Sequence, residues 1–416
     1  MKKKLLRMLL FVITMYSLII PNAYAVEYKT DGNFKYYVED GQAYLFEYNG
    51  DEENVVIPNE VEGLPVKGIG YKTGFYNVFN EDIKTLTIPS GVEYIGKSAL
   101  HYCQSLKSVI IPNTVTFIGE KAFRKCNSLT EITIPESVTT IEDYAFEECE
   151  NLVAANILGS VVGENMFARC ENLTTVNLGE NVTKIGELAF IGCENITEIT
   201  IPESVTTIEP GAFRATGIES IIIPESITKM GYNIFQYCYD LEKVVFKNPN
   251  TTFEEVAGIR EHVMDDEKDP TFAYCDNLSV FYAFKGSQAQ NYSLNNNLEF
   301  VPIANVEING ERVKSDIPAI IKNNRVLIPM RAIFEKFGAE VDWNGETRTV
   351  TAAAGDKMIV MQIGEEEIGV NGEIKEIDVA PQMLMNRTIV PARAVSESLG
   401  ATVEWDEARQ TVVINY

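Results

Sequence analysis

Apolar residues recur along the first two thirds of the chain with a fixed spacing. The thirteen residues Thr130 to Glu142, TEITIPESVTTIE, return unchanged at Thr197 to Glu209, 67 positions further on. Related segments lie between and beside them, and together they give the unit L-x-x-I-x-I-P-x-x-V-x-x-I-x-x-x-A-F-x-x-C, about 23 residues long. A repeat of this length is typical of solenoids, in which each unit forms one turn of a stacked array.

The apolar period changes twice within each unit. Alternating Ile132 and Ile134 predict a short strand that ends at Pro135. Apolar positions within 138–141 predict a second extended piece, and apolar residues then recur every third position from Phe146 to Leu152, which favours a short helical turn. One unit cannot bury its own apolar face, whereas stacked units share a core with strands about 4.8 Å apart.

The ends and irregular turns of the array are also visible. From Val26 to Val66 apolar and polar residues alternate between glycines and asparagines, so we expect short strands that cap the first turn. The turn between Ile157 and Phe167 is two residues shorter than its predecessor, which predicts a slight pinch. After Phe246 the insertion KNPNTTFEEVAGIREHVMDDEKDPT interrupts the last turn, and because long loops are often functional, it is a candidate functional segment.

A different duplication follows Ile303. Residues Arg325 to Val350 match Arg387 to Val412 at a constant offset of 62. Each copy predicts a strand that ends at a proline, a short amphipathic helix, and a left-handed cap at Gly338 or Gly400.

Each copy of this unit then continues through a G-A-x-V-x-W motif into a predicted hairpin. Trp343 and Trp405, which end the motif, are the only tryptophans in the chain. We expect them to be core anchors rather than ligand platforms.

Both repeats resemble known families. The unit I-P-x-x-V-x-x-I-G-x-x-A-F-x-x-C-x-x-L resembles the BspA-like leucine-rich repeat of bacterial surface proteins, and Gly286 to Ile303 is similar to the terminal cap of such arrays. The paired motif R-x-[LI]-[IV]-P-x-R-A…G-A-x-V-x-W resembles the copper amine oxidase N-terminal-like domain, which in amine oxidases is a stalk separate from the catalytic part. These resemblances imply a secreted or surface-displayed protein with a role in adhesion, joined to a structural or wall-associated module.

The predicted fold class is mainly β with short helical turns: a leucine-rich repeat solenoid followed by a small duplicated α+β domain. We assign residues 1–25 to a signal peptide, 26–303 to the capped solenoid and 304–416 to the copper amine oxidase N-terminal-like domain.

The leader supports secretion. A basic start is followed by an apolar run from Met8 to Ile20 and a small-x-small site from Ala23 to Ala25, which is typical of a signal peptide cleaved after Ala25. A membrane anchor is the alternative, but the apolar run is short for a span of about 20 residues. We expect a soluble protein that is extracellular or associated with the cell surface, with no transmembrane segment after cleavage.

The charge of the chain excludes some partners. The formal net charge is −25, and it becomes more negative when the basic leader is removed. Such a chain repels nucleic acid phosphates and anionic membranes. The acidic runs at 265–267 and 365–367 lack the ligand spacing of a calcium loop, so we expect solvated loops.

The cysteines follow the repeat rather than a disulfide framework. A thiol in one column of a stacked core behaves as a small apolar residue, and seven cysteines cannot all pair within one chain. We expect free core thiols, with oxidation between neighbouring turns as the alternative, and no zinc site. The cysteines are Cys103, Cys126, Cys149, Cys170, Cys193, Cys238 and Cys275.

The sequence offers little for catalysis. It has two histidines, His101 in a position expected to face solvent and His262 in the insertion, so a copper site of several imidazoles is excluded. The quinone motif T-x-x-N-Y is absent at Asn291-Tyr292 and Asn415-Tyr416. No glycine-rich phosphate loop is present, and a Ser or Cys nucleophile lacks a base beyond these imidazoles. Paired carboxylates are too numerous to identify or exclude a glycosidase. We predict no enzyme activity, no cofactor and no metal.

Binding by an exposed surface remains. In each first strand, the residue between the last two apolar positions points outward, so the array presents a ladder at strand spacing. The alternative is that these residues only fill a sheet. If the face binds, Ile222 and Val245 are the expected anchors. The candidate binding face consists of Thr87, Ile110, Thr133, Asn156, Asn177, Thr200, Ile222 and Val245.

We therefore predict a secreted or cell-surface binding and adhesion protein, non-catalytic, that uses its leucine-rich repeat face to recognise an extracellular protein or glycan of a host or a cell wall. The alternative is a cell-envelope structural module that binds wall polymer.

Overall fold

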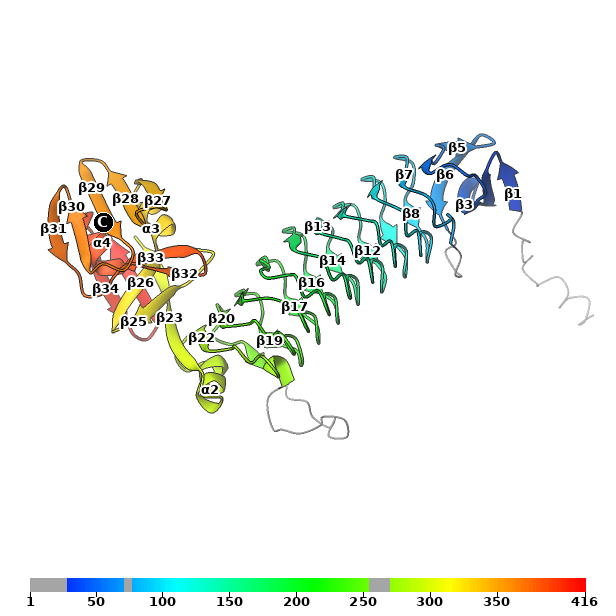
Figure 1. Ribbon diagram of the computed structural model, residues 1–416. Coiled ribbons are helices and arrows are strands. Elements are labelled where there is room, and N and C mark those ends of the chain that lie inside the picture. Colours follow the sequence, from blue (N-terminus) through cyan, green and yellow to red (C-terminus); the bar gives the residue numbers. More distant parts are fainter. Residues whose placement is uncertain (1–27, 71–76, 254–269) are drawn as a thin grey trace, which may run out of the picture.

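The computed structural model describes residues 28–70, 77–253 and 270–416. A long solenoid of about ten turns leads into a C-terminal domain (Figure 1). The predicted fold class, mainly β with a spacing of about 23 residues, is confirmed. The predicted signal peptide and His262 lie outside the described residues.

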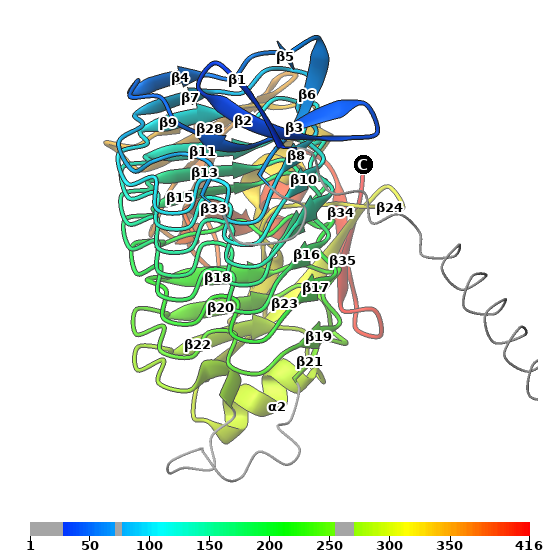
Figure 2. The same ribbon diagram turned by 90° about the vertical axis from the view of Figure 1, so that its right-hand side faces the viewer.

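The first strands of successive turns form one side of the solenoid. They pair in parallel and in register, so that Ile132 lies opposite Ala155 and Ile134 opposite Ile157. Figure 2 shows them stacked in one column. Their bounds are β4 (Asn54–Val56), β7 (Thr85–Thr87), β9 (Ser108–Ile110), β11 (Glu131–Ile134), β13 (Ala154–Ile157), β15 (Thr175–Leu178), β18 (Ser220–Ile223), β20 (Lys243–Phe246) and β22 (Val280–Ala283).

Shorter strands form the second side. This ladder is interrupted between β12 and β14, at the shortened turn. There Gly159 lies so close to the preceding turn that an added Cβ would be 2.7 Å from the carbonyl oxygen of Val138. The strands are β6 (Leu64–Ile69), β8 (Tyr94–Ile95), β10 (Phe117–Ile118), β12 (Thr140–Ile141), β14 (Val161–Val162), β16 (Lys184–Ile185), β17 (Thr207–Ile208), β19 (Lys229–Met230) and β21 (Thr252–Phe253).

The third side, where the pattern favours a short helical turn, consists of successive tight turns. Two residues four positions apart, such as Lys121 (φ 59°) and Lys125 (φ 61°), adopt the left-handed conformation. Every second amide then points to the next turn: Phe123 N donates to Ala145 O at 2.8 Å, and Lys125 N to Glu147 O at 2.9 Å. This side therefore also adds to the hydrogen bonding between turns.

A column of stacked phenylalanines fills the centre. Adjacent rings lie 4.8–5.6 Å apart and within 14° of parallel. Nearly all of these side chains are fully buried, so the stack ties each turn to both neighbours. The rings are Phe123, Phe146, Phe167, Phe190, Phe213, Phe235 and Phe272.

The cysteine column lies beside this stack. Six thiols donate to a backbone carbonyl of the preceding turn at 3.0–3.2 Å, as Cys170 does to Phe146 O. All seven cysteines are free, as predicted, and six are buried. Burial raises the pKa of Cys103 and Cys193 to about 12. Where the repeat has Thr216 instead, its hydroxyl donates to Phe213 O at 2.9 Å.

The N-terminal segment covers the first turn, as predicted. It forms an antiparallel meander, whose last strand β3 pairs in parallel with β6 of the solenoid. Tyr48 of β3 packs on Phe79 with ring centroids 5.8 Å apart. The strands are β1 (Tyr28–Asp31), β2 (Phe34–Glu39) and β3 (Gln42–Tyr48), and β5 (Glu60–Val61) pairs with β6.

The other end is closed by η1 (Pro270–Phe272) and by helix α2 (Gln288–Asn295), which begins at the cap residue Ser287. Tyr292 of α2 stacks on Phe281 at 5.3 Å and contacts Phe272, the last ring of the column. The terminal cap implied for Gly286 to Ile303 is thus in place.

The C-terminal domain has the predicted duplication. Strands β26 (Arg325–Pro329) and β33 (Arg387–Pro391) pair antiparallel about Ile328 and Val390, which are equivalent at the offset of 62. The helices and hairpins follow at the same offset: α3 (Met330–Lys336) and α4 (Ala392–Ser398), β27 (Glu340–Asn344) and β34 (Thr402–Asp406), β28 (Thr349–Ala354) and β35 (Thr411–Asn415). The other strands are β24 (Glu311–Arg312), β25 (Ala319–Lys322), β29 (Lys357–Gln362), β30 (Glu367–Val370), β31 (Glu373–Glu376) and β32 (Gln382–Leu384).

Both helices end at the predicted glycines. Gly338 has φ 66° and Gly400 has φ 96°. The amide of the next residue reaches back into the last helical turn, Ala339 N to Phe334 O at 2.8 Å and Ala401 N to Ser396 O at 2.9 Å. This is the geometry of a left-handed C-cap.

The solenoid and the C-terminal domain share strand β23 (Glu299–Ile308). Its first residues pair with β22 of the solenoid, and its later residues pair with β25, β24 and β35 of the domain (Figure 1). The predicted boundary between residues 303 and 304 therefore falls inside one continuous strand.

The thiols provide a test of the packing. Because six of the seven thiols are buried and out of reach of the reagent, iodoacetamide at pH 8.5 should modify none of them in the folded protein, except the partly exposed Cys275 at most. In urea all seven should react, which mass spectrometry counts directly. Rapid labelling of several thiols without urea would contradict the described core.

The ring column provides a second test. Phe190→Ala leaves a cavity between Phe167 and Phe213 and should lower the free energy of unfolding by about 3–5 kcal/mol, measured by urea denaturation. Thr200→Ala, at an exposed position, should change it by less than about 0.5 kcal/mol.

Candidate functional site

The outward residues of the first strands form a continuous exposed face. Pairing places Val56 beside Thr87 and Thr87 beside Ile110, and it places Asn156 between Thr133 and Asn177. Thr200 is exposed in the next turn. We define the strand face as Val56, Thr87, Ile110, Thr133, Asn156, Asn177 and Thr200.

The middle of the strand face carries amide and hydroxyl groups. Asn177 Nδ2 donates to Asn156 Oδ1 at 2.7 Å, and Asn156 Nδ2 donates to Thr133 Oγ1 at 3.3 Å. Each amide has further hydrogen-bonding capacity. A ligand would therefore meet a row of oriented, uncharged polar groups.

The apolar part of the strand face lies at its N-terminal end. Ile110 is 79% exposed and Val56 is 67% exposed. Val56 is absent from the predicted ladder, although Val55-Val56-Ile57-Pro58 repeats the I-x-I-P pattern of later units. That pattern would have identified the additional turn.

The predicted anchors at the other end are wrong. Val245 is fully buried, and Ile222 is half-buried against a cluster that contains Phe284 and Ile303. The C-terminal domain covers this end of the ladder. The insertion also begins later than predicted, because residues up to Phe253 continue the second ladder in register. Residues 254–269 of it lie outside the described residues.

A cleft of about 620 Å³ lies where the C-terminal domain meets the strand face. Thr200, Glu198 and Ile222 line its solenoid side, and residues 312–319 and Arg387 line its domain side. The strand face thus ends in a partly enclosed pocket.

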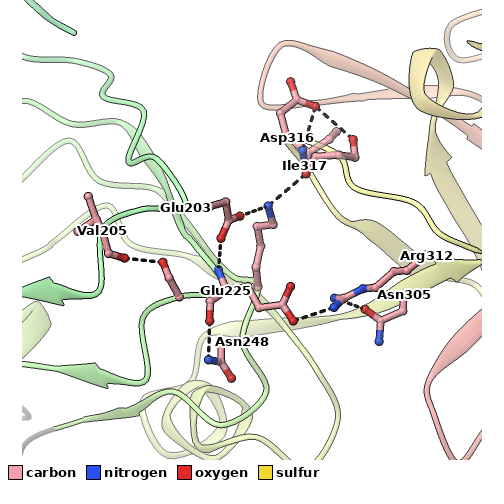
Figure 3. A network of polar contacts seen from close by, with 11 residues as sticks. Glu203, Val205, Glu225, Asn248, Asn305, Arg312, Asp316 and Ile317 are labelled. Carbon is pink, nitrogen blue, oxygen red and sulfur yellow. Dashed lines mark hydrogen bonds and ion pairs between the residues drawn. The ribbon is translucent and has the colours of Figure 1, made fainter. Parts of the chain in front are cut away.

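A polar network spans this junction (Figure 3). Lys247 Nζ donates to Glu203 Oε1 at 2.6 Å and to Ser315 O at 3.1 Å. Arg312 donates to Glu225 Oε1 and to Asn305 Oδ1, both at 2.8 Å. Lys247 of the solenoid and Arg312 of the domain therefore each donate a hydrogen bond across the junction, which fixes the walls of the cleft.

Asp316 carries a negative charge at the domain side of the cleft. Burial opposes its ionisation, but Arg387 and the amide of Ile317 outweigh burial and lower the pKa of Asp316. Arg387 Nε donates to its Oδ2 at 2.5 Å.

The tryptophans differ from the prediction. Trp405 is half-buried and packs against the domain core, but Trp343 is 41% exposed and is not a core anchor. The difference arises because β27 has almost entirely exposed side chains, whereas β34 pairs with the central strand β35.

His101 is half-buried rather than solvent-facing. Burial and the neighbouring Arg124 lower its pKa to about 4, so the imidazole is neutral at physiological pH. Within residues 28–70, 77–253 and 270–416, no group of three or more His, Cys, Asp or Glu side chains is placed to hold a metal ion. The helices in these ranges are too short or too polar to cross a membrane.

Comparison with known families agrees with this architecture. The model of the BspA type leucine rich repeat region matches residues 69–162 and 160–258, with six copies. The repeats of this region are therefore BspA-type leucine-rich repeats. Residues 307–414 match the copper amine oxidase N-terminal domain.

Similar proteins cover parts of the chain. A protease inhibitor of Brevibacillus choshinensis is 29% identical over 108 residues, which are 26% of this chain. The chain spans about a third of the length of that curated relative, 33%.

Two solved structures are similar to parts of this chain. A leucine-rich repeat protein from Bacteroides ovatus is 25% identical, with 62% of this chain and 69% of that chain covered and a TM-score of 0.45. A leucine rich cell surface protein from Faecalibacterium prausnitzii is 26% identical, with coverage of 66% and 94% and a TM-score of 0.43. At these TM-scores neither structure bears on the ligand of this chain.

The junction network can be tested without altering the strand face. Lys247→Met removes the bonds to Glu203 and Ser315 and should weaken the contact by about 1 kcal/mol, which hydrogen exchange would detect as faster exchange in residues 312–316. Lys184→Met, which removes an ion pair to Glu209 on the second ladder, is the matched control and should leave that exchange unchanged.

Proposed function

We propose that this protein is a secreted or cell-surface binding protein that recognises an extended segment of an extracellular protein or glycan along the strand face, without catalysis. The observation that carries the proposal is the continuous exposed column from Val56 to Thr200, which ends in the junction cleft.

The composition of the face suits an extended ligand. Its polar groups are spaced at about 4.8 Å, the distance between neighbouring strands, so an extended ligand along the column would meet them one after another. Ile110 and Val56 supply apolar contact at one end, and the cleft supplies charged groups at the other. A ligand that lay along the strand face and into the cleft would bury apolar and polar surface together, as specific interfaces do.

Extracellular placement is part of the proposal. It is supported by the predicted signal peptide and by the match of residues 69–258 to a repeat type that is typical of bacterial surface proteins. Inhibition of proteases is not proposed, because the inhibitor match covers only a third of that protein.

Charge introduced on the strand face should abolish binding. In the full secreted chain, Ile110→Asp with Thr133→Asp places two carboxylates where a ligand would lose water, so affinity should fall at least about a hundredfold. Binding is measured by interferometry against purified matrix proteins, a glycan array and isolated cell walls.

Thr139→Asp with Thr206→Asp is the matched control, because both residues are exposed on the second ladder. It should bind as the unaltered chain does. Equal loss in both double variants, or retained binding in the first, would remove the strand face from the proposal. Retention on cell walls alone, unaffected by either pair, would favour the alternative of a wall-polymer module.

A further inference from the structure

The two copies of the duplicated unit each form a groove on the C-terminal domain. Groove 1, about 1010 Å³, is lined by α3, Trp343 and residues 312–316; groove 2, about 690 Å³, is lined by α4, Trp405 and residues 375–379. Fifteen of the sixteen residues lining groove 1 have their counterpart, 62 positions away, in the lining of groove 2. The chain thus presents one pocket twice, and each copy is a control for the other.

The grooves share a crossed ion pair. Asp316 pairs with Arg387 in groove 1, and its equivalent Asp378 pairs with Arg325 in groove 2, with oxygen to nitrogen distances of 2.5 and 2.6 Å. In each case the arginine is the first residue of a strand in the other copy: Arg387 begins β33, and Arg325 begins β26. These pairs hold the two grooves in the same shape.

The charge of the two grooves differs. Groove 1 has five basic side chains against two carboxylates, although the chain as a whole has a formal net charge of −25. Lys314 and Lys336 of groove 1 are replaced by Glu376 and Ser398 in groove 2, where four basic side chains meet five carboxylates. Only groove 1 therefore presents an excess of positive charge.

The arginine on each helix also differs. Arg393 of groove 2 pairs with Glu397 at 3.7 Å, whereas Arg331 forms no ion pair within the part of the chain that the structure describes. Lys314 is likewise exposed and has no carboxylate partner among those residues. Groove 1 keeps cationic groups available to a ligand.

The tryptophans follow the same contrast. The indole N–H of Trp405 donates to Glu407. The equivalent of Glu407 is Gly345, so Trp343 lacks this bond, and its ring is 41% exposed beside Met383, which is 42% exposed. Of the two grooves, only groove 1 combines an exposed tryptophan with cationic side chains that have no carboxylate partner among the described residues.

We propose that groove 1 binds an anionic glycan: a sugar ring lies against Trp343, and the phosphate or carboxylate of the same polymer contacts Lys314 and Arg331. A tryptophan supplies an apolar face and a polar N–H, which suits a ring with one apolar face and a hydroxyl rim. The remote acidic surface opposes this little, because the Debye length is about 8 Å at physiological ionic strength.

A nucleic acid fits less well. Single strands bind to several aromatic platforms in succession within a long basic channel, whereas Trp343 is the one aromatic residue in the lining of groove 1. Groove 1 shares residues 312–316 with the junction cleft, but Arg331 and Trp343 line groove 1 and not the cleft, so variants at these two residues test groove 1 separately from the strand face.

Calorimetry with the full secreted chain and four probes of matched length tests the proposal: a uronic acid oligosaccharide, a glycosylated polyol phosphate oligomer, a neutral oligosaccharide and a DNA oligonucleotide. At least one of the first two should bind, and comparison of these two identifies carboxylate or phosphate as the anion. Arg331→Glu and Trp343→Ala should each weaken this binding at least about tenfold, and added salt should weaken it further.

Arg393→Glu, the same change in groove 2, is the matched control and should alter affinity less than about twofold. Both arginines are exposed on short helices, and thermal melting checks that both variants fold. The proposal is overturned if neither anionic glycan binds, if Arg393→Glu costs as much as Arg331→Glu, or if the oligonucleotide binds as tightly and Trp343→Ala has no effect.

Discussion

The structure depends on the contact between one turn and the next. Each turn leaves an aromatic ring, a thiol and backbone amides on three sides facing its neighbour, and none of these groups is satisfied until that neighbour is in place. The same dependence requires closed ends. The meander β1 to β3 closes one end, and α2 with Tyr292 closes the other. The C-terminal domain follows from this requirement, because the strand that finishes the array continues as the centre of the next sheet.

That continuity decides which part of the strand face is available. The domain lies over the last turns, where the outward column becomes apolar; there Ile222 is half-buried against the domain and Val245 is fully buried. The uncovered part therefore combines hydroxyl and amide groups with the exposed Val56 and Ile110. The domain also supplies the opposite wall of the cleft through Arg312 and Ser315. The strand face and the C-terminal domain are thus parts of one assembly.

Periodicity in the sequence was sufficient to predict whatever is repeated: the strands, the buried phenylalanine and cysteine columns, the capping glycines and the outward ladder. It failed where the outcome depends on contacts between distant segments. Val245 has the same place in its unit as Thr133, yet only Val245 lies beneath another domain. Trp343 and Trp405 end the same motif, and their different exposure depends on which strands their hairpins join. The two grooves could not be predicted from the sequence, because each combines residues from both copies of the duplicated unit with a segment that precedes one copy.

The shared strand β23 also determines how the molecule carries mechanical load. Two domains joined by a flexible linker must first extend that linker before force passes between them. Here a pull on the solenoid reaches the C-terminal domain through the backbone of β23 and through the ladders on both of its flanks. Several hydrogen bonds are then loaded together, and the angle between the parts is kept under tension. A protein built in this way keeps the strand face at a constant tilt relative to its C-terminal domain.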